Sequence, residues 1–123
     1  MKMRLPLLAF LAAAQAGSAL ACSCVPASFD EVVARAPGVF EGRVLATRTV
    51  AAEQRVVARV AATKWTKGRA RPIVLVESTT APGMCGYPLV QGRVYTFGAG
   101  YDKRGRLVTD MCAMAPLDAR RAR

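Results

Sequence analysis

The chain has 123 residues, of which 18 are Lys or Arg, 8 are Asp or Glu and none is His, so its formal net charge is +10 at pH 7. A chain without histidine excludes a histidine-based catalytic triad and a metal held by imidazole. The eight carboxylates are scattered and offer no obvious close pair for acid–base work. The composition therefore predicts a protein that is not an enzyme and that carries no cofactor.

The first 21 residues have the pattern of a secretory signal peptide. Lys2 and Arg4 precede an apolar run that is too short to span a bilayer, and small residues end the segment at Ala21. Cleavage after Ala21 leaves one small domain, residues 22–123, in the periplasm or outside the cell. No later segment is apolar enough to cross a membrane, and the Ala- and Arg-rich composition suggests a bacterial exported protein.

Cleavage at this point makes Cys22 the first residue of the exported protein. In the alternative, a lipoprotein, the cysteine carries a lipid, and the signal prefers a branched aliphatic residue three positions before it and a small residue two before it. Here Ala19 and Leu20 stand in the reverse order. We therefore expect a free amino terminus at Cys22, with a lipid anchor as the alternative.

The exported part keeps a strong basic charge. Of the 18 Lys and Arg residues, two lie in the leader, so 16 stand against 8 acidic residues, a net charge of about +8. Nucleic acid, anionic lipid, wall polymers and acidic proteins are attracted by such a charge. The basic residues are spread along the chain, up to the terminal run 120–123, which reads as a solvated basic end. No specific binding of nucleic acid is expected.

All four cysteines lie in the exported part, at Cys22, Cys24, Cys85 and Cys112. An even number of cysteines in an oxidising compartment predicts two disulfides. Pairing the first two cysteines would close a very small strained ring, whereas either crossed pairing closes long loops, each worth roughly 4 kcal/mol in the chain-entropy model. The residues leave both crossed pairings open. A four-cysteine zinc site and a redox C-x-C are weaker alternatives, because only one close pair is present and no βαβ unit is predicted.

The exported domain is predicted to begin with one short helix. Ser28 and Glu31 have the spacing of a capping box, and the helix continues to about Arg35 before the Pro37-Gly38 pair ends it. Strands follow, with turn residues between them, at 39–45, 54–65, 73–76, 93–99 and 106–112. Within 54–65 the predicted faces are Val56, Ala58, Val60 and Ala62 on one side and Arg55, Val57, Arg59 and Ala61 on the other.

Five strands separated by turn signals predict a small Greek-key barrel, so the fold class is β-dominated. The aromatic side chains at strand spacing could form a binding platform, but packing in the core or on the sheet is the stronger interpretation. They are Trp65, Tyr87, Tyr95, Phe97 and Tyr101.

Four motifs together resemble a known family. They are Cys22-Ser23-Cys24-Val25-Pro26 at the expected amino terminus, the strand and turn from Ala62 to Gly68, Cys85-Gly86-Tyr87, and Thr109-Asp110-Met111-Cys112. In this order they resemble the inhibitory domain of the tissue inhibitors of metalloproteinases, within the wider group of netrin modules. The resemblance covers nearly the whole exported chain, although the third disulfide and the second domain of the animal inhibitors have no counterpart here.

The resemblance implies a five-stranded barrel of the oligonucleotide/oligosaccharide-binding (OB) type with helices at its side, and the pairing Cys22 with Cys85 and Cys24 with Cys112. It also implies an inhibitory ridge made of the first residues and of the loop that leads to the third cysteine. Carried over to this chain, the ridge is Cys22, Ser23, Cys24, Val25, Pro26, Ala81, Pro82, Gly83, Met84 and Cys85.

The implied partner is a zinc metalloprotease, bound by a monomer of this chain. A catalytic zinc with three protein ligands keeps a fourth position for water, which a chelator can take. The α-amine and carbonyl oxygen of Cys22 form such a chelator, while its sulfur holds the terminus in place through a disulfide. Ser23 would then point toward the specificity pocket of the protease. The alternative is a netrin-like binding module of the cell envelope that inhibits nothing.

Overall fold

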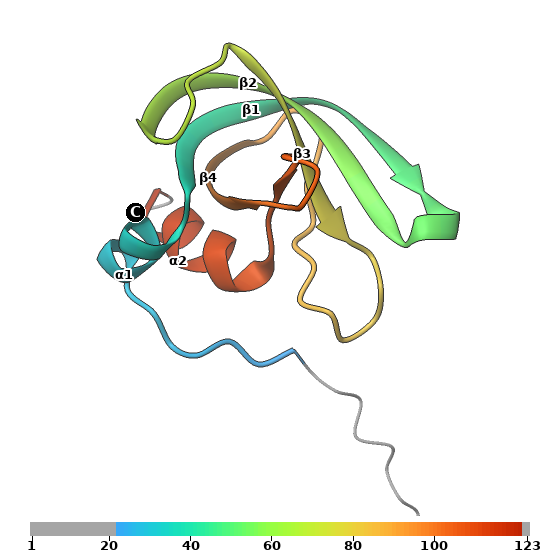
Figure 1. The fold of residues 1–123 in the computed structure, drawn as a ribbon, viewed down its shortest axis with the longest axis horizontal. Helices are drawn as coiled ribbons and strands as arrows, with labels where there is room; N and C mark the ends of the chain where they lie inside the picture. Colours follow the sequence, from blue (N-terminus) through green and yellow to red (C-terminus); the bar gives the residue numbers. More distant parts are fainter. Residues whose placement is uncertain (1–21, 122–123) are drawn as a thin grey trace, which may run out of the picture.

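The computed structural model describes residues 22–121, so the expected leader 1–21 and the last two residues lie outside it (Figure 1). In chain order the elements are α1 (Phe29–Arg35), β1 (Gly38–Val50), a 3₁₀ turn η1 (Ala51–Glu53), β2 (Arg55–Lys67), β3 (Ile73–Thr79), β4 (Val94–Tyr101), β5 (Leu107–Val108) and α2 (Met111–Arg121). The predicted short helix and all five strand regions are present, although the boundaries of the strands differ.

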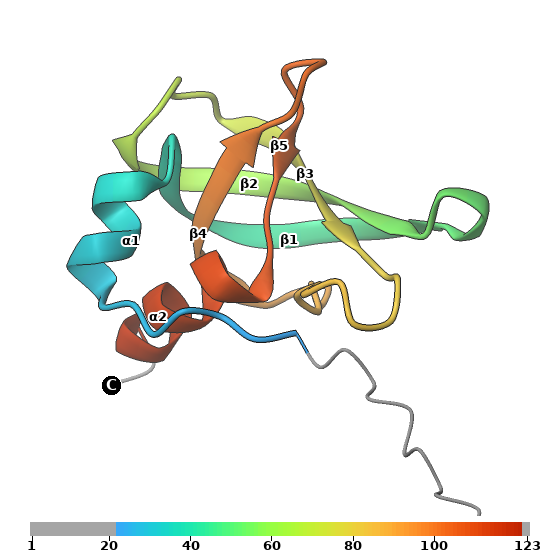
Figure 2. The ribbon, with the colours of Figure 1, turned by 60° about the horizontal axis from the view of Figure 1, so that its bottom comes forward.

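The five strands form one closed ring in the order β1-β2-β3-β5-β4. Strand β1 pairs antiparallel with both β2 and β4, and β2 pairs antiparallel with β3. The ring closes through β5, which pairs antiparallel with β4 and parallel with β3 over two residue pairs only. The sheet is therefore mixed, and β5 is joined to each of its neighbours by two residue pairs only. The β1–β2 hairpin extends well beyond the ring (Figures 1 and 2).

Helix α1 is fixed at both ends by side chains. At its start the hydroxyl of Ser28 accepts a hydrogen bond from the amide of Glu31 at 3.2 Å, which confirms the predicted cap. At its end the ammonium of Lys67 donates to the carbonyls of Val33 and Ala34, both at 3.0 Å. The second strand of the barrel thereby satisfies carbonyl groups in the last turn of the helix, where a cation is also favoured by the helix dipole.

The predicted inward pattern of β2 is confirmed at Ala58 and Val60, which are fully buried. The core around them contains a run of contacting aromatic rings: Trp65 stacks on Phe40 with ring centroids 4.3 Å apart, Phe40 on Phe97 at 4.9 Å, and Tyr95 lies edge-on to Phe97 at 5.7 Å. Most of the five aromatic side chains therefore pack in or against the core, as predicted. Tyr101 is the exception, because it is 42% exposed.

The last predicted strand, 106–112, is wrong over most of its length. Only Leu107–Val108 of the range 106–112 is a strand, and from Met111 the chain is the helix α2, so Cys112 lies on a helix. The cause is Asp110, whose carboxylate accepts a hydrogen bond from the amide of Ala113 at 2.9 Å and so caps the helix. The terminal residues Arg120 and Arg121 lie in the last turn of α2, where both are exposed, and Arg121 also donates to the carbonyl of Val94 at 3.3 Å.

Helix α2 packs against β4 and covers one end of the barrel (Figure 2). Gly98 makes this approach possible, because a Cβ there would lie 2.9 Å from the Cδ1 atom of Leu117. The carbonyl of Gly98 also accepts a hydrogen bond from the buried hydroxyl of Thr109 at 2.6 Å. These contacts set the position of the first turn of α2, which carries Cys112.

Gly42 tests the packing of the barrel wall. A Cβ at this position would lie 2.5 Å from the Cγ1 atom of the fully buried Val60 and 2.9 Å from the carbonyl oxygen of Ala61. We expect Gly42→Ala to lower the free energy of unfolding by about 1–3 kcal/mol, because neither neighbour can move freely. Gly100→Ala, on β4 with nothing within 4 Å of the added Cβ, is the matched control and should be close to neutral. Equal chemical-denaturation midpoints for the two variants would contradict this assignment.

Candidate functional site

Two neighbouring disulfides hold the amino-terminal segment against the rest of the fold. Cys22 is bonded to Cys85 with a Cα–Cα distance of 5.0 Å, and Cys24 to Cys112 with one of 5.2 Å. The four sulfur atoms lie within 4.8 Å of one another, and no cysteine of residues 22–121 is free. Because each sulfur is used in a disulfide, the cluster is not available as a thiolate metal site.

The tethered segment before α1 has no regular secondary structure, and its side chains differ in exposure. Cys22 and Cys24 are half-buried, whereas Ser23 between them is exposed. Val25 is 78% exposed and Pro26 is exposed as well. The two bridges therefore hold a short stretch of backbone in which Ser23, the one residue between the two bridged cysteines, is exposed.

The loop after β3 lies beside this segment and is built from local hydrogen bonds. The hydroxyl of Thr79 accepts from the amide of Ala81 at 3.1 Å, and the carbonyl of Ala81 accepts from the amide of Met84 at 3.3 Å. Gly83 takes a positive φ of 73° inside this turn, a conformation that glycine adopts at little cost. The side chain of Met84, the next residue in this loop, is 63% exposed.

The backbone of Cys85 and Gly86 is constrained in two separate ways. Cys85 itself has a positive φ of 62°, which is uncommon for a residue other than glycine. Gly86 is pressed against the strand before it, since an added Cβ would overlap the carbonyl oxygen of Thr79. The carbonyl of Cys85 in turn accepts a hydrogen bond from the amide of Met111 at 2.7 Å, which joins the loop to the start of α2.

Tyr87 connects the same loop to the far end of α2. Its amide donates to the hydroxyl of the buried Ser78 at 2.9 Å, and its own hydroxyl donates to the carboxylate of Asp118 at 2.9 Å. Burial and the neighbouring Asp118 carboxylate raise the pKa of Tyr87 to about 12. The phenol is therefore neutral and acts as a donor across the physiological pH range.

The structure divides the predicted ridge between two hollows. Cys22, Ala81, Gly83 and Cys85 line one of about 470 Å³, together with residues that sequence reasoning missed, which are Val56, Thr79, Thr80, Gly86, Tyr87, Pro88 and Met111. Val25 lines a different hollow of about 390 Å³, beside Cys112 and α1. Ser23, Pro26, Pro82 and Met84 are exposed around them. Of the missed residues, Gly86 and Tyr87 belong to the C-G-Y motif and Met111 to the T-D-M-C motif, whereas no motif marks the other four.

No protein-family model matches this chain, and no curated protein sequence matches it. Within residues 22–121 no helix is long and apolar enough to cross a membrane. The two disulfides are consistent with an oxidising environment of the kind that an exported protein meets.

Gly86→Ala tests the close approach between the loop and β3. We expect it to lower the free energy of unfolding by about 1–3 kcal/mol or more, because the obstructing atom is backbone and is fixed in the sheet. The measurement is the denaturation midpoint of the oxidised protein, with a peptide map to show that both disulfides have formed. A variant that unfolds like the wild type would show that this contact is absent in solution.

Tyr87→Phe tests the link between the loop and α2. Because the folded pKa of Tyr87 lies above the value of about 10 for a free tyrosine, its stabilising effect is present below pH 10 and is lost as the pH rises toward 12. We expect the variant to be less stable than the wild type by about 1 kcal/mol at pH 8, and the gap to shrink between pH 10 and 12. Tyr101→Phe, at a tyrosine that is 42% exposed, should show no such change in denaturation series at the same pH values.

Proposed function

We propose that the exported chain inhibits zinc metalloproteases in the manner of the tissue inhibitors of metalloproteinases. The observation that carries the proposal is the Cys22–Cys85 disulfide, which holds the backbone of Cys22 beside the loop before Cys85. A terminus fixed in this way loses little conformational freedom on binding, so the ordering cost of placing its amine and carbonyl on a metal is small.

Several further features support the proposal. Both disulfides join the cysteines that the family resemblance implies. The strand order β1-β2-β3-β5-β4 in a closed ring is the order of an OB-type Greek-key barrel, which is the fold of the netrin group. The side chains that would contact a protease stand in solvent, above all Ser23, Val25 and Met84.

In the proposed complex, Cys22 supplies its α-amine and its carbonyl oxygen to the catalytic zinc of the protease. These two groups replace the water that the zinc would otherwise activate, so the attacking nucleophile is lost. Ser23 follows in the direction of a substrate and fills the specificity pocket. The exposed Met84 side chain on the neighbouring loop adds apolar contact area.

One added residue before Cys22 tests this mechanism directly. An alanine in front of Cys22 converts the chelating amine into an amide, so we expect inhibition of a susceptible zinc protease to be abolished while the melting temperature stays nearly unchanged. The measurement is the inhibition constant against a panel of zinc metalloproteases, with intact mass to verify where each chain starts. An alanine added after Arg123 is the control and should retain full potency.

Two results would contradict the proposal. One is an extended chain that inhibits as well as the mature chain does. The other is a chain that starts at an unmodified Cys22, carries both bridges and inhibits no member of the panel. The alternative, a non-inhibitory module that binds through its basic surface, predicts instead that partner capture falls steeply with salt and does not depend on the amino terminus.

A further inference from the structure

A larger hollow of about 550 Å³ lies at the other end of the barrel from the disulfides. Its position follows from the short pairing of β5, because β5 begins to pair with β3 only at Val76 and leaves the first half of β3 without a partner on that side. The turn after β4 borders the gap. In Figure 2 this turn and the amino-terminal segment lie at opposite ends of the molecule.

The walls of this hollow are mainly apolar and include side chains that are exposed. Of the eight large hydrophobic side chains that are exposed within residues 22–121, three line it: Ile73 at 40%, Leu75 at 58% and Tyr101 at 42%. Trp65 forms a rigid side of the hollow, since its indole N–H donates to the carbonyl of Arg71 at 3.0 Å and its ring stacks on a buried phenylalanine. Apolar surface gathered in one concave place is typical of a ligand site.

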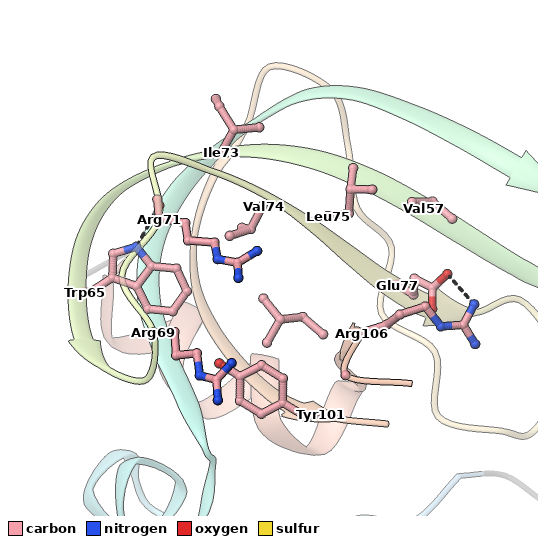
Figure 3. A pocket seen from close by; sticks show the side chains of 12 residues that line it. Val57, Trp65, Arg69, Arg71, Ile73, Val74, Leu75, Glu77, Tyr101 and Arg106 are labelled. Atoms are coloured by element: carbon pink, nitrogen blue, oxygen red, sulfur yellow. Dashed lines mark hydrogen bonds and ion pairs between the residues drawn. The ribbon is translucent and has the colours of Figure 1, made fainter. Parts of the chain in front are cut away.

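Two arginines give the hollow a positive charge. The side chains of Arg69 and Arg71 reach from the β2–β3 loop toward its middle (Figure 3). Neither forms an ion pair with a carboxylate of the part of the chain that the structure describes. A third arginine, Arg106, is instead neutralised locally, because it lies 2.8 Å from Asp102 and 3.4 Å from Glu77.

The one carboxylate that lines the hollow, that of Glu77, is neutralised by neighbouring arginines. Glu77 is 6% exposed and is paired with both Arg55 and Arg106, so it contributes no unbalanced negative charge to the interior. The unbalanced charge is therefore that of the two guanidinium groups at the β2–β3 loop. An anion at this position gains charge-assisted hydrogen bonds, which planar guanidinium groups form well with carboxylates.

We propose that this hollow binds a soluble long-chain carboxylate. The carboxylate is held by Arg69 and Arg71, and the alkyl chain lies along Ile73, Leu75 and the indole of Trp65. The volume falls in the range of small-molecule sites. Aliphatic side chains outnumber the two aromatic ones among the lining residues, which favours an alkyl chain over a stacked base or sugar.

Trp65 provides the readout, because it is the single tryptophan of the chain. Titration of the purified exported protein with dodecanoate, below the concentration at which micelles form, is expected to change its fluorescence in a saturable way. Each methylene that is buried should tighten binding about three- to fourfold, so decanoate should bind about tenfold more weakly. Dodecanol, which lacks the carboxylate, should also bind about tenfold more weakly.

A charge-matched pair of variants separates a built site from general attraction to a basic protein. Arg69→Gln combined with Arg71→Gln is expected to weaken dodecanoate binding by about tenfold or more. Arg35→Gln combined with Arg93→Gln removes the same charge at exposed positions outside this hollow and should leave the affinity unchanged. Melting temperatures establish that both double variants are folded.

The proposal is overturned if dodecanoate causes no saturable change, if both double variants bind alike, or if chain length has no effect. It is also overturned if the fluorescence responds only to phosphatidylglycerol vesicles or only to a single-stranded oligonucleotide, because the occupant would then be a membrane or a nucleic acid. The alanine extension before Cys22 should not alter dodecanoate binding, so this site and the proposed inhibition can fail independently of each other.

Discussion

The crossed pair of disulfides is the constraint on which the arrangement of this molecule depends. Only one residue separates Cys22 from Cys24. Yet Cys22 is bonded to a loop cysteine 63 residues further along the chain, and Cys24 to a helix cysteine 88 residues further along. The segment before α1 has no strand partner, so these two bonds replace the backbone ladder that would otherwise hold it. They also bring the loop after β3 and the start of α2 to the same place.

The barrel carries two distinct surfaces because its two ends are covered differently. At one end α2, the disulfides and the Tyr87–Asp118 hydrogen bond cover the ring. At the other end the short pairing between β3 and β5 leaves apolar side chains of β3 in solvent. Contacting aromatic rings join Trp65 at the open end to Tyr87 at the covered end through the core. The packed interior thus joins the two surfaces that are proposed as separate sites.

Local signals in the sequence predicted local structure well. Ser28 caps α1 because its hydroxyl meets an amide only three residues away, and the inward residues of β2 alternate because every second side chain faces the core. The strand prediction for the last element was wrong beyond Val108 for an equally local reason. Asp110 is a helix cap that was assigned to a strand, and Pro116 inside the helix is a residue that argues against helix in any sequence pattern.

By itself, the sequence determined the number of strands, the first helix and the need for two long-range disulfides, because these depend on residue type, spacing and loop length. Loop length favoured both crossed pairings equally, and only the family resemblance chose between them. The tertiary structure decided which sulfurs lie within bonding distance, how the predicted ridge divides between two hollows, and where Arg69 and Arg71 meet the exposed side of β3. These features arise where segments distant in the chain come together, and no local pattern specifies which segments those are.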